Sequence, residues 1–140
     1  MKKIFNMNKF KLLLQLSFLI SASAFSQDKF QLSSHILNVA QGKPAANVKI
    51  KLSKLENDQW KQVDEKLTDE NGRIKDFLRQ DGKDHRGVYK LTYFTKPYFE
   101  KQNQSSFYPF IEVVFELKDN EHYHVPITLS AYGYSTYRGN

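Results

Sequence analysis

Three histidines and one arginine are the side chains of this chain best suited to acid–base chemistry. His35 lies in an alternating stretch near the start, His122 and His124 are separated by one residue near the end, and Arg73 follows an Asn-Gly turn. An imidazole titrates close to neutral pH and can therefore accept or donate a proton there. A guanidinium stays cationic and can stabilise a developing oxyanion. Together these residue types allow acid–base chemistry by histidine, with an arginine to stabilise developing negative charge.

Other chemistries have no support in the sequence. The chain of 140 residues contains no cysteine, which excludes thiolate nucleophiles, disulfides and cysteine-ligated metals. It has no G-x-S-x-G nucleophile elbow, no P-loop and no G-x-G-x-x-G fingerprint. The sequence therefore favours neither a hydrolase with a serine nucleophile nor a nucleotide-binding domain.

The His122-x-His124 pair leaves a metal site as an alternative. Residues two apart on a strand face the same side, so both imidazoles would point together, and His35 could add a third nitrogen. No acidic residue has the spacing of a hydrogen-bonding partner for such ligands. We therefore predict no metal and no cofactor, and a chelator would separate the two readings.

Each candidate also has a plainer interpretation. Alternation puts His35 on one face with Leu37 and Val39, which is typical of a packed core histidine. Arg73 begins a strand-like segment with Ile74 and Phe77 and, taken alone, is typical of a solvated arginine. His85 is typical of a charged loop. The tyrosine-rich tail, residues 131–140, is expected to dock, either as an edge strand or as the lining of a site that its terminal carboxylate also faces.

Short strands must position these groups. Period-two alternation or β-branched and aromatic runs, separated by Gly, Pro, Asn and Asp turns, recur along the chain, and one segment of about two turns is helical in pattern. The predicted strands are Ser33–Val39, Val48–Leu52, Trp60–Thr68, Val88–Thr95, Ile111–Leu117, Tyr123–Ser130 and Tyr134–Tyr137, and the predicted helix is Pro97–Asn103. This pattern predicts an all-β, antiparallel sandwich of seven to eight strands with one short helix.

The strand that carries the histidine pair has two distinct faces. Alternation puts Tyr123, Val125, Ile127 and Leu129 on one side, as a core face, and the imidazoles on the other. Pro126 falls on the histidine side, which predicts an edge or irregular strand.

The N-terminus has the pattern of an export signal. Lysines, a nine-residue apolar run and a segment of small residues follow one another within residues 1–26. We expect cleavage before Gln27, which leaves a single domain, 27–140, exported to the periplasm and with no membrane contact. Residues 1–26 carry +4 of the net charge of +6, so overall basicity does not indicate a nucleic-acid partner.

Five blocks of the sequence, in order, resemble the transthyretin-like 5-hydroxyisourate hydrolases. The blocks are Leu32–Ala45, Thr68–Arg73, Phe107–Phe110, His122–Pro126 and Gly133–Gly139. The resemblance implies two four-stranded sheets with one helix, a homotetramer built as a dimer of dimers, and active sites in the cleft between subunits.

The resemblance also implies a substrate and roles for residues. It implies hydrolysis of 5-hydroxyisourate to 2-oxo-4-hydroxy-4-carboxy-5-ureidoimidazoline in urate degradation, with His35, Arg73 and His124 catalytic. Substrate contacts would come from His35, Arg73, Tyr137 and Asn140. The chain departs from the family at Asn140, where a serine usually ends the chain. The alternative is a non-catalytic exported module of this fold that binds a small hydrophobic ligand or a protein.

Overall fold

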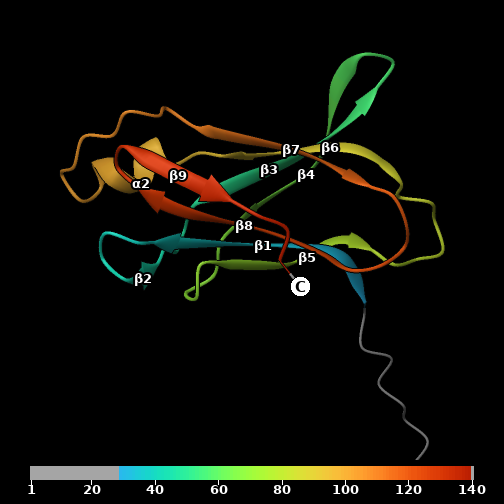
Figure 1. Ribbon diagram of the computed structural model, residues 1–140, viewed down its shortest axis with the longest axis horizontal. Coiled ribbons are helices and arrows are strands. Elements are labelled where there is room, and N and C mark those ends of the chain that lie inside the picture. Colours follow the sequence, from blue (N-terminus) through green and yellow to red (C-terminus); the bar gives the residue numbers. More distant parts are fainter. Residues whose placement is uncertain (1–28, 140) are drawn as a thin grey trace, which may run out of the picture.

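Two β-sheets packed face to face, with one short helix, form the described part of the chain in a computed structural model that covers residues 29–139 (Figure 1). The strands are β1 (Phe30–Asn38), β2 (Lys43–Pro44), β3 (Lys49–Glu56), β4 (Gln59–Leu67), β5 (Arg73–Arg79), β6 (Gly87–Tyr93), β7 (Ile111–Leu117), β8 (Tyr123–Ser130) and β9 (Gly133–Thr136), and the helix is α2 (Lys96–Glu100). The predicted sandwich with one helix is thereby confirmed, but the described residues form nine strands rather than seven to eight, in sheets of five and four strands rather than four and four.

The two sheets are built from different parts of the chain. Sheet A has the order β2-β1-β8-β9, with β5 also pairing with β1, and sheet B has the order β4-β3-β6-β7. The strands β1 and β8 pair in parallel, whereas every other pair of named strands in residues 29–139 is antiparallel. The expectation of a purely antiparallel sandwich is corrected here. These two strands are far apart in the sequence, so no hairpin dictates their direction.

The predicted elements differ from the observed ones at a few places. Strands β7 and β8 have the predicted bounds, β5 corresponds to the strand-like segment that begins at Arg73, and the two-residue β2 is not predicted. Helix α2 begins at Lys96 and ends at Glu100, before the predicted end at Asn103. Asn103 has a positive φ of 53°, a left-handed conformation that a right-handed helix cannot continue through.

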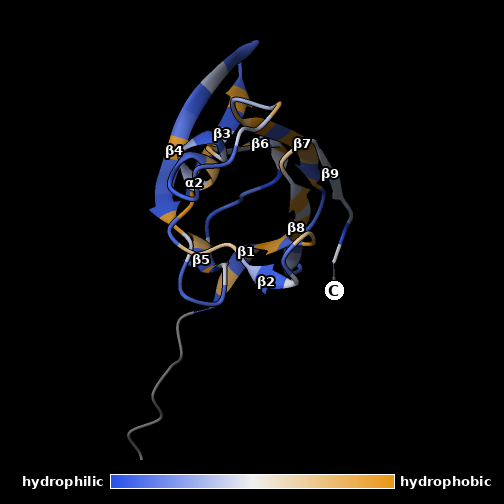
Figure 2. Cartoon of the chain, turned by 90° about the vertical axis from the view of Figure 1, so that its left-hand side faces the viewer, coloured by the Kyte–Doolittle hydropathy of each residue, from blue (hydrophilic) through white to orange (hydrophobic). Residues whose placement is uncertain are grey.

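Alternation along the strands produces the core between the sheets. On β1 the alternating residues Leu32, Ser34 and Ile36 are completely buried, and on β7 Ile111 and Leu117 are nearly so. In Figure 2 the strands of the two sheets lie on opposite sides of the interior, and the hairpin of β3 and β4 that projects beyond them is largely hydrophilic. The hydrophobic effect therefore fixes which face of each strand is left for chemistry.

A buried polar contact joins the sheets directly behind the histidine-bearing strands. The hydroxyls of Ser34 and Tyr93 lie 3.0 Å apart, and the Val125 carbonyl oxygen lies 2.8 Å from the first and 3.0 Å from the second. Burial raises the pKa of Tyr93, so its hydroxyl keeps its proton. The contact ties β6 of sheet B to β1 and β8 of sheet A, which stabilises the alignment of those two strands.

Two expectations about β1 and β8 need correction. The face that His35 shares with Leu37 and Val39 is the outer face of sheet A, not the core, and Val39 is 51% exposed. Strand β8 is an interior strand, with β1 on one side and β9 on the other. Pro126 is accommodated because β8 and β9 pair only from Ile127 onward.

No helix within residues 29–139 is long and apolar enough to span a membrane. The proposed export signal, residues 1–26, lies outside the described residues.

Candidate functional site

A hollow of about 570 Å³ opens on the outer face of sheet A. Its lining residues are Ser33 of β1, Arg73 and Lys75 of β5, His122 just before β8, His124 on β8, and Tyr137 and Gly139 of the tail. The volume falls within the roughly 300–1,000 Å³ typical of small-molecule sites. Four separate segments of the chain thus contribute polar side chains to one cavity.

The turn before β5 sets the position of Arg73. The Asp69 carboxylate accepts hydrogen bonds from the backbone N–H groups of Asn71, at 2.9 Å, and Arg73, at 2.8 Å. Gly72 has a φ of +68°, and a Cβ there would lie 2.6 Å from the Ile36 carbonyl oxygen. Only glycine fits this close approach to β1, so the Asp-x-x-Gly-Arg sequence serves to hold Arg73 against that strand.

His35 and Arg73 are directly opposed residues of the β1–β5 ladder. Directly opposed side chains in an antiparallel pair lie about 4.5–5.5 Å apart at Cβ. His35 lies beside the hollow and is half-buried, whereas Arg73 is exposed and lines it. The guanidinium makes no ion pair within the described part of the chain, which leaves its charge available to a ligand.

His124 is held by a serine on the neighbouring strand. Ser33 and His124 are partners in the parallel β1–β8 ladder, and the Ser33 Oγ lies 2.8 Å from His124 Nδ1. The same Oγ lies 2.9 Å from Nε2 of His122, whose Nδ1 lies 2.9 Å from the Phe30 carbonyl oxygen. The predicted histidine pair therefore converges on one hydroxyl.

Burial and positive charge keep the imidazoles neutral. Burial, followed by the charge of Arg73 and then of the neighbouring histidines, holds the pKa of His124 below its ordinary value of 6.5. Burial and Arg73 also lower the pKa of His35, against hydrogen bonding to the Asn71 backbone and the charge of Asp69. At neutral pH both groups therefore have a nitrogen that can accept a proton.

The tail docks along β8 as an edge strand and then lines the hollow. Strand β9 pairs with β8, and further on the Gly139 N–H donates a 2.8 Å hydrogen bond to the His124 carbonyl oxygen. The Arg138 guanidinium lies 4.7 Å from the centroid of the Tyr123 ring. Tyr137 is 61% exposed at the rim. Asn140, the remaining predicted contact, lies outside the described residues.

The described side chains do not favour the metal site that the His122-x-His124 pair left as an alternative. Within residues 29–139 no group of three or more His, Cys, Asp or Glu side chains is placed to hold a metal ion. His122 points both ring nitrogens at oxygen atoms of the protein, and His124 points one.

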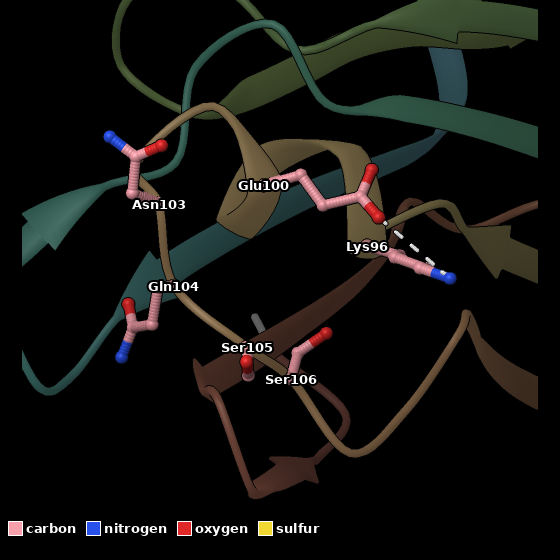
Figure 3. Close-up of a pocket in the computed structure, with 6 residues that line it drawn as sticks. All are labelled: Lys96, Glu100, Asn103, Gln104, Ser105 and Ser106. Atoms are coloured by element: carbon pink, nitrogen blue, oxygen red, sulfur yellow. Dashed lines mark ion pairs between the residues drawn. The ribbon is translucent and has the colours of Figure 1, made fainter.

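A second hollow, of about 330 Å³, lies at the end of α2 and is of a different kind (Figure 3). Lys96 and Glu100 form a 3.7 Å ion pair on one side, and the amides of Asn103 and Gln104 lie on the other. It contains no imidazole and no nucleophile with a base beside it, so the catalytic candidates belong to the sheet A hollow.

Sequence reasoning missed two residues that line the hollow and left a third without a role. Lys75 lies two residues after Arg73 on β5, and period-two alternation from Arg73 would have placed it on the same face. Ser33 gave no local signal, because its contact to β8 depends on the pairing of distant strands. His122 was noted only as half of a metal motif.

The fold and the site define a transthyretin-like sandwich with a histidine–arginine site on the outer face of one sheet. A family model described as HIUase/Transthyretin family matches residues 32–139, and the chain belongs to this family. A Caenorhabditis elegans protein named "Probable 5-hydroxyisourate hydrolase" is 41% identical over 96% of this chain and 100% of its own length.

Two solved structures are similar to this chain. Transthyretin from Sparus aurata has a TM-score of 0.73 at 30% identity, over 79% of this chain and 97% of its own. The 5-hydroxyisourate hydrolase of Klebsiella pneumoniae has a TM-score of 0.67 at 32% identity, over 78% and 98%. The resemblance noted in the sequence is confirmed.

Proposed function

We propose that this protein hydrolyses 5-hydroxyisourate to 2-oxo-4-hydroxy-4-carboxy-5-ureidoimidazoline as a step of urate degradation. One observation carries the proposal: Arg73 and His124 line the same hollow, and His35 is directly opposed to Arg73. The protein is a 5-hydroxyisourate hydrolase by family and by similarity to the enzymes of C. elegans and K. pneumoniae.

The reaction opens one ring amide by addition of water. An imidazole takes a proton from the water, whose oxygen bonds to the amide carbon, and the C–N bond then breaks as the nitrogen gains a proton. Either His35 or His124 can serve as base, with the other orienting the water or protonating the nitrogen. Such proton transfer contributes roughly 10²–10⁴-fold.

Positive charge supports the addition step. Arg73 can present two parallel N–H groups to the oxygens of a urate-like ring. Beside a developing oxyanion, such a donor contributes on the order of 3 kcal/mol. Lys75 adds a second positive charge, and no acidic side chain lines the hollow within residues 29–139. Tyr137, at the rim, can contact the substrate by ring stacking or through its hydroxyl.

The test generates 5-hydroxyisourate with urate oxidase and follows its ultraviolet decay with and without the protein. His35→Ala, Arg73→Ala and His124→Ala should each slow enzymatic decay by at least about 100-fold. His85→Ala is the matched control, since His85 lies in the loop before β6 and its Nε2 contacts the Arg79 carbonyl instead. Turnover near that of wild type in any of the three variants removes that residue from the mechanism.

The non-catalytic alternative is a carrier of a small hydrophobic ligand. A similar structure of sea bream transthyretin, solved in complex with thyroxine, supports this alternative. The lining of the hollow disfavours it, because two cations and two imidazoles would lose hydration against an apolar ligand without compensation. Saturable binding of an apolar fluorescent dye, combined with no acceleration of 5-hydroxyisourate decay, would favour the carrier.

We further propose a homotetramer, a dimer of dimers, whose subunits cover this face of sheet A. The exposure of Tyr137 at the rim of the hollow supports a cover from another copy. Light scattering at micromolar concentration should give four times the chain mass. A monomer with full activity contradicts this arrangement.

Export to the periplasm is proposed from the pattern of residues 1–26. Expression of the full chain in a bacterium with an outer membrane should place the protein in the periplasmic fraction, with Gln27 as its first residue. Edman sequencing or mass spectrometry of the N-terminus tests both expectations, and an intact Met1 in the cytoplasmic fraction contradicts them.

A further inference from the structure

His122 and Ser33 are the parts of the site that the mechanism above does not use. Ser33 is 9% exposed, and its Oγ lies between two ring nitrogens, 2.9 Å from His122 Nε2 and 2.8 Å from His124 Nδ1. A hydroxyl has one proton, so it can donate to only one of these nitrogens and must accept from the other. The direction of this short chain of hydrogen bonds decides where His124 carries its proton.

The Phe30 carbonyl fixes that direction. It is an acceptor only and lies 2.9 Å from His122 Nδ1, so this nitrogen is assigned the proton. In a neutral His122 the Nε2 atom is then bare and must accept the Ser33 proton. Ser33 Oγ, having donated, accepts from Nδ1–H of His124. The chain therefore runs from His124 through Ser33 and His122 to the Phe30 carbonyl.

The consequence falls on the far nitrogen of His124. With the proton on Nδ1, the Nε2 atom carries a lone pair and makes no hydrogen bond within the described residues. Next to it in the ring, Cδ2 contacts Gly139, and the side chain lines the hollow with Arg73. His35 lies outside this lining and has no contact to the chain of hydrogen bonds. His35 has its own hydrogen bond, to the Asn71 backbone, but of the two candidate bases only His124 lines the hollow and has its tautomer set by this chain of hydrogen bonds.

We propose that Ser33 and His122 are positioning residues that lock His124 in its Nδ1–H tautomer and so make His124 the general base. The role of His124 as general base rests on the proposed hydrolysis, whereas its tautomer is a property of the folded protein. When His124 takes a proton from water, both of its nitrogens become donors, and the Ser33–His122 chain continues to accept from Nδ1. Within residues 29–139, the other charged or ionisable groups at this part of the site are Arg73, Lys75, Tyr137 and the nearby His35.

Nitrogen-15 NMR of the histidine rings tests the lock without any assay. At pH 7.5 the wild-type His124 ring should show a protonated Nδ1 and a bare Nε2. Ser33→Ala and His122→Phe remove the relay at different points and should move His124 toward the Nε2–H tautomer. Ser33→Thr retains the hydroxyl and should restore the wild-type pattern, and the dispersion of the same spectra reports whether each variant is folded.

Steady-state kinetics test the role of His124 as general base. Ser33→Ala and His122→Phe should lower kcat by about 10- to 100-fold with KM changed less than about 3-fold, and Ser33→Thr should recover most of kcat. A wild-type His124 in the Nε2–H form, or an unchanged tautomer in Ser33→Ala, overturns the lock. A changed tautomer with unchanged kcat overturns the role in catalysis. A wild-type protein with the expected tautomer but no hydrolysis contradicts the proposed function while still supporting the lock.

Discussion

Gly139 lies close against the side chain of His124. A Cβ at Gly139 would lie 2.5 Å from His124 Cδ2 and 3.2 Å from both Cβ and Cγ of that side chain. The Gly139 N–H also donates to the His124 carbonyl oxygen at 2.8 Å. The penultimate residue of the chain therefore sets how closely the tail approaches the proposed base.

Gly139→Ala should reduce activity without unfolding the protein. The added methyl forces either the imidazole or the tail away, and a displacement of about 1 Å at a catalytic group can cost on the order of 100-fold. Stability should change little, because the segment from Tyr137 to Gly139 is largely exposed. Steady-state kinetics and a thermal melt measure the two effects.

The matched control for this change is another tail glycine. A Cβ at Gly133 would meet only Ser130 Oγ, at 3.7 Å, which is ordinary contact. Gly133→Ala should therefore retain wild-type kcat/KM. Equal activity of both variants would mean that the tail does not hold His124.

Gly72→Ala should destabilise the fold. Its left-handed φ costs an alanine about 1–2 kcal/mol, and the clash with the Ile36 carbonyl adds to this. We expect a loss of at least about 3 kcal/mol in the free energy of unfolding, measured by urea denaturation. Gly42→Ala separates the two causes, since Gly42 has a φ of +63° but nothing within 4 Å of its Cβ position. A similar loss in both variants would exclude the close approach to β1 as the reason for glycine at 72.

The sequence predicted the faces of strands better than their partners. Period-two alternation put both histidines of β8 opposite its core residues, and these residues are buried as expected. It could not show that His35 faces Arg73 or that Ser33 faces His124, because strand pairing over long sequence separations leaves no local pattern. His35 was given a core-like face for the same reason: Leu37 and Val39 are apolar, but they belong to the outer side of sheet A.

Very short elements and irregular ends of strands also escaped prediction. Strand β2 has two residues, too few for alternation to be recognised. In β5, adjacent Phe77 and Leu78 are both buried, and Leu78 has a φ of 55°. This distortion breaks the period after Phe77, so the sequence indicates a strand-like segment with Arg73, Ile74 and Phe77 but not the end of the strand.

Tyr93→Phe should weaken the link between the sheets. It removes one of the two hydroxyls shared with Val125, while Ser34 still donates to that carbonyl. We expect a loss of about 1 kcal/mol in the free energy of unfolding with an unchanged denaturant slope. Tyr134→Phe, at a residue 42% exposed, is the control and should leave stability within about 0.5 kcal/mol. If the two variants are equally stable, the buried contact does not stabilise the alignment of the sheets.

The acid limb of the pH profile should report the charge of Arg73. Burial and Arg73 lower the pKa values of His35 and His124, so the neutral, base-competent form persists as pH falls through 6.5 and is lost only at more acidic pH. The value of kcat/KM, which reports the protonation of the free enzyme, should therefore be level across neutral pH and fall below pH 6.5.

Variants of Arg73 test the cause of these lowered pKa values. Arg73→Gln removes the positive charge and should raise both pKa values toward 6.5, whereas Arg73→Lys keeps the charge. Because either change also affects substrate binding, the readout is the ring-proton NMR titration of the two histidines rather than the rate. Titration midpoints that stay in place in Arg73→Gln would show that burial alone keeps these imidazoles neutral.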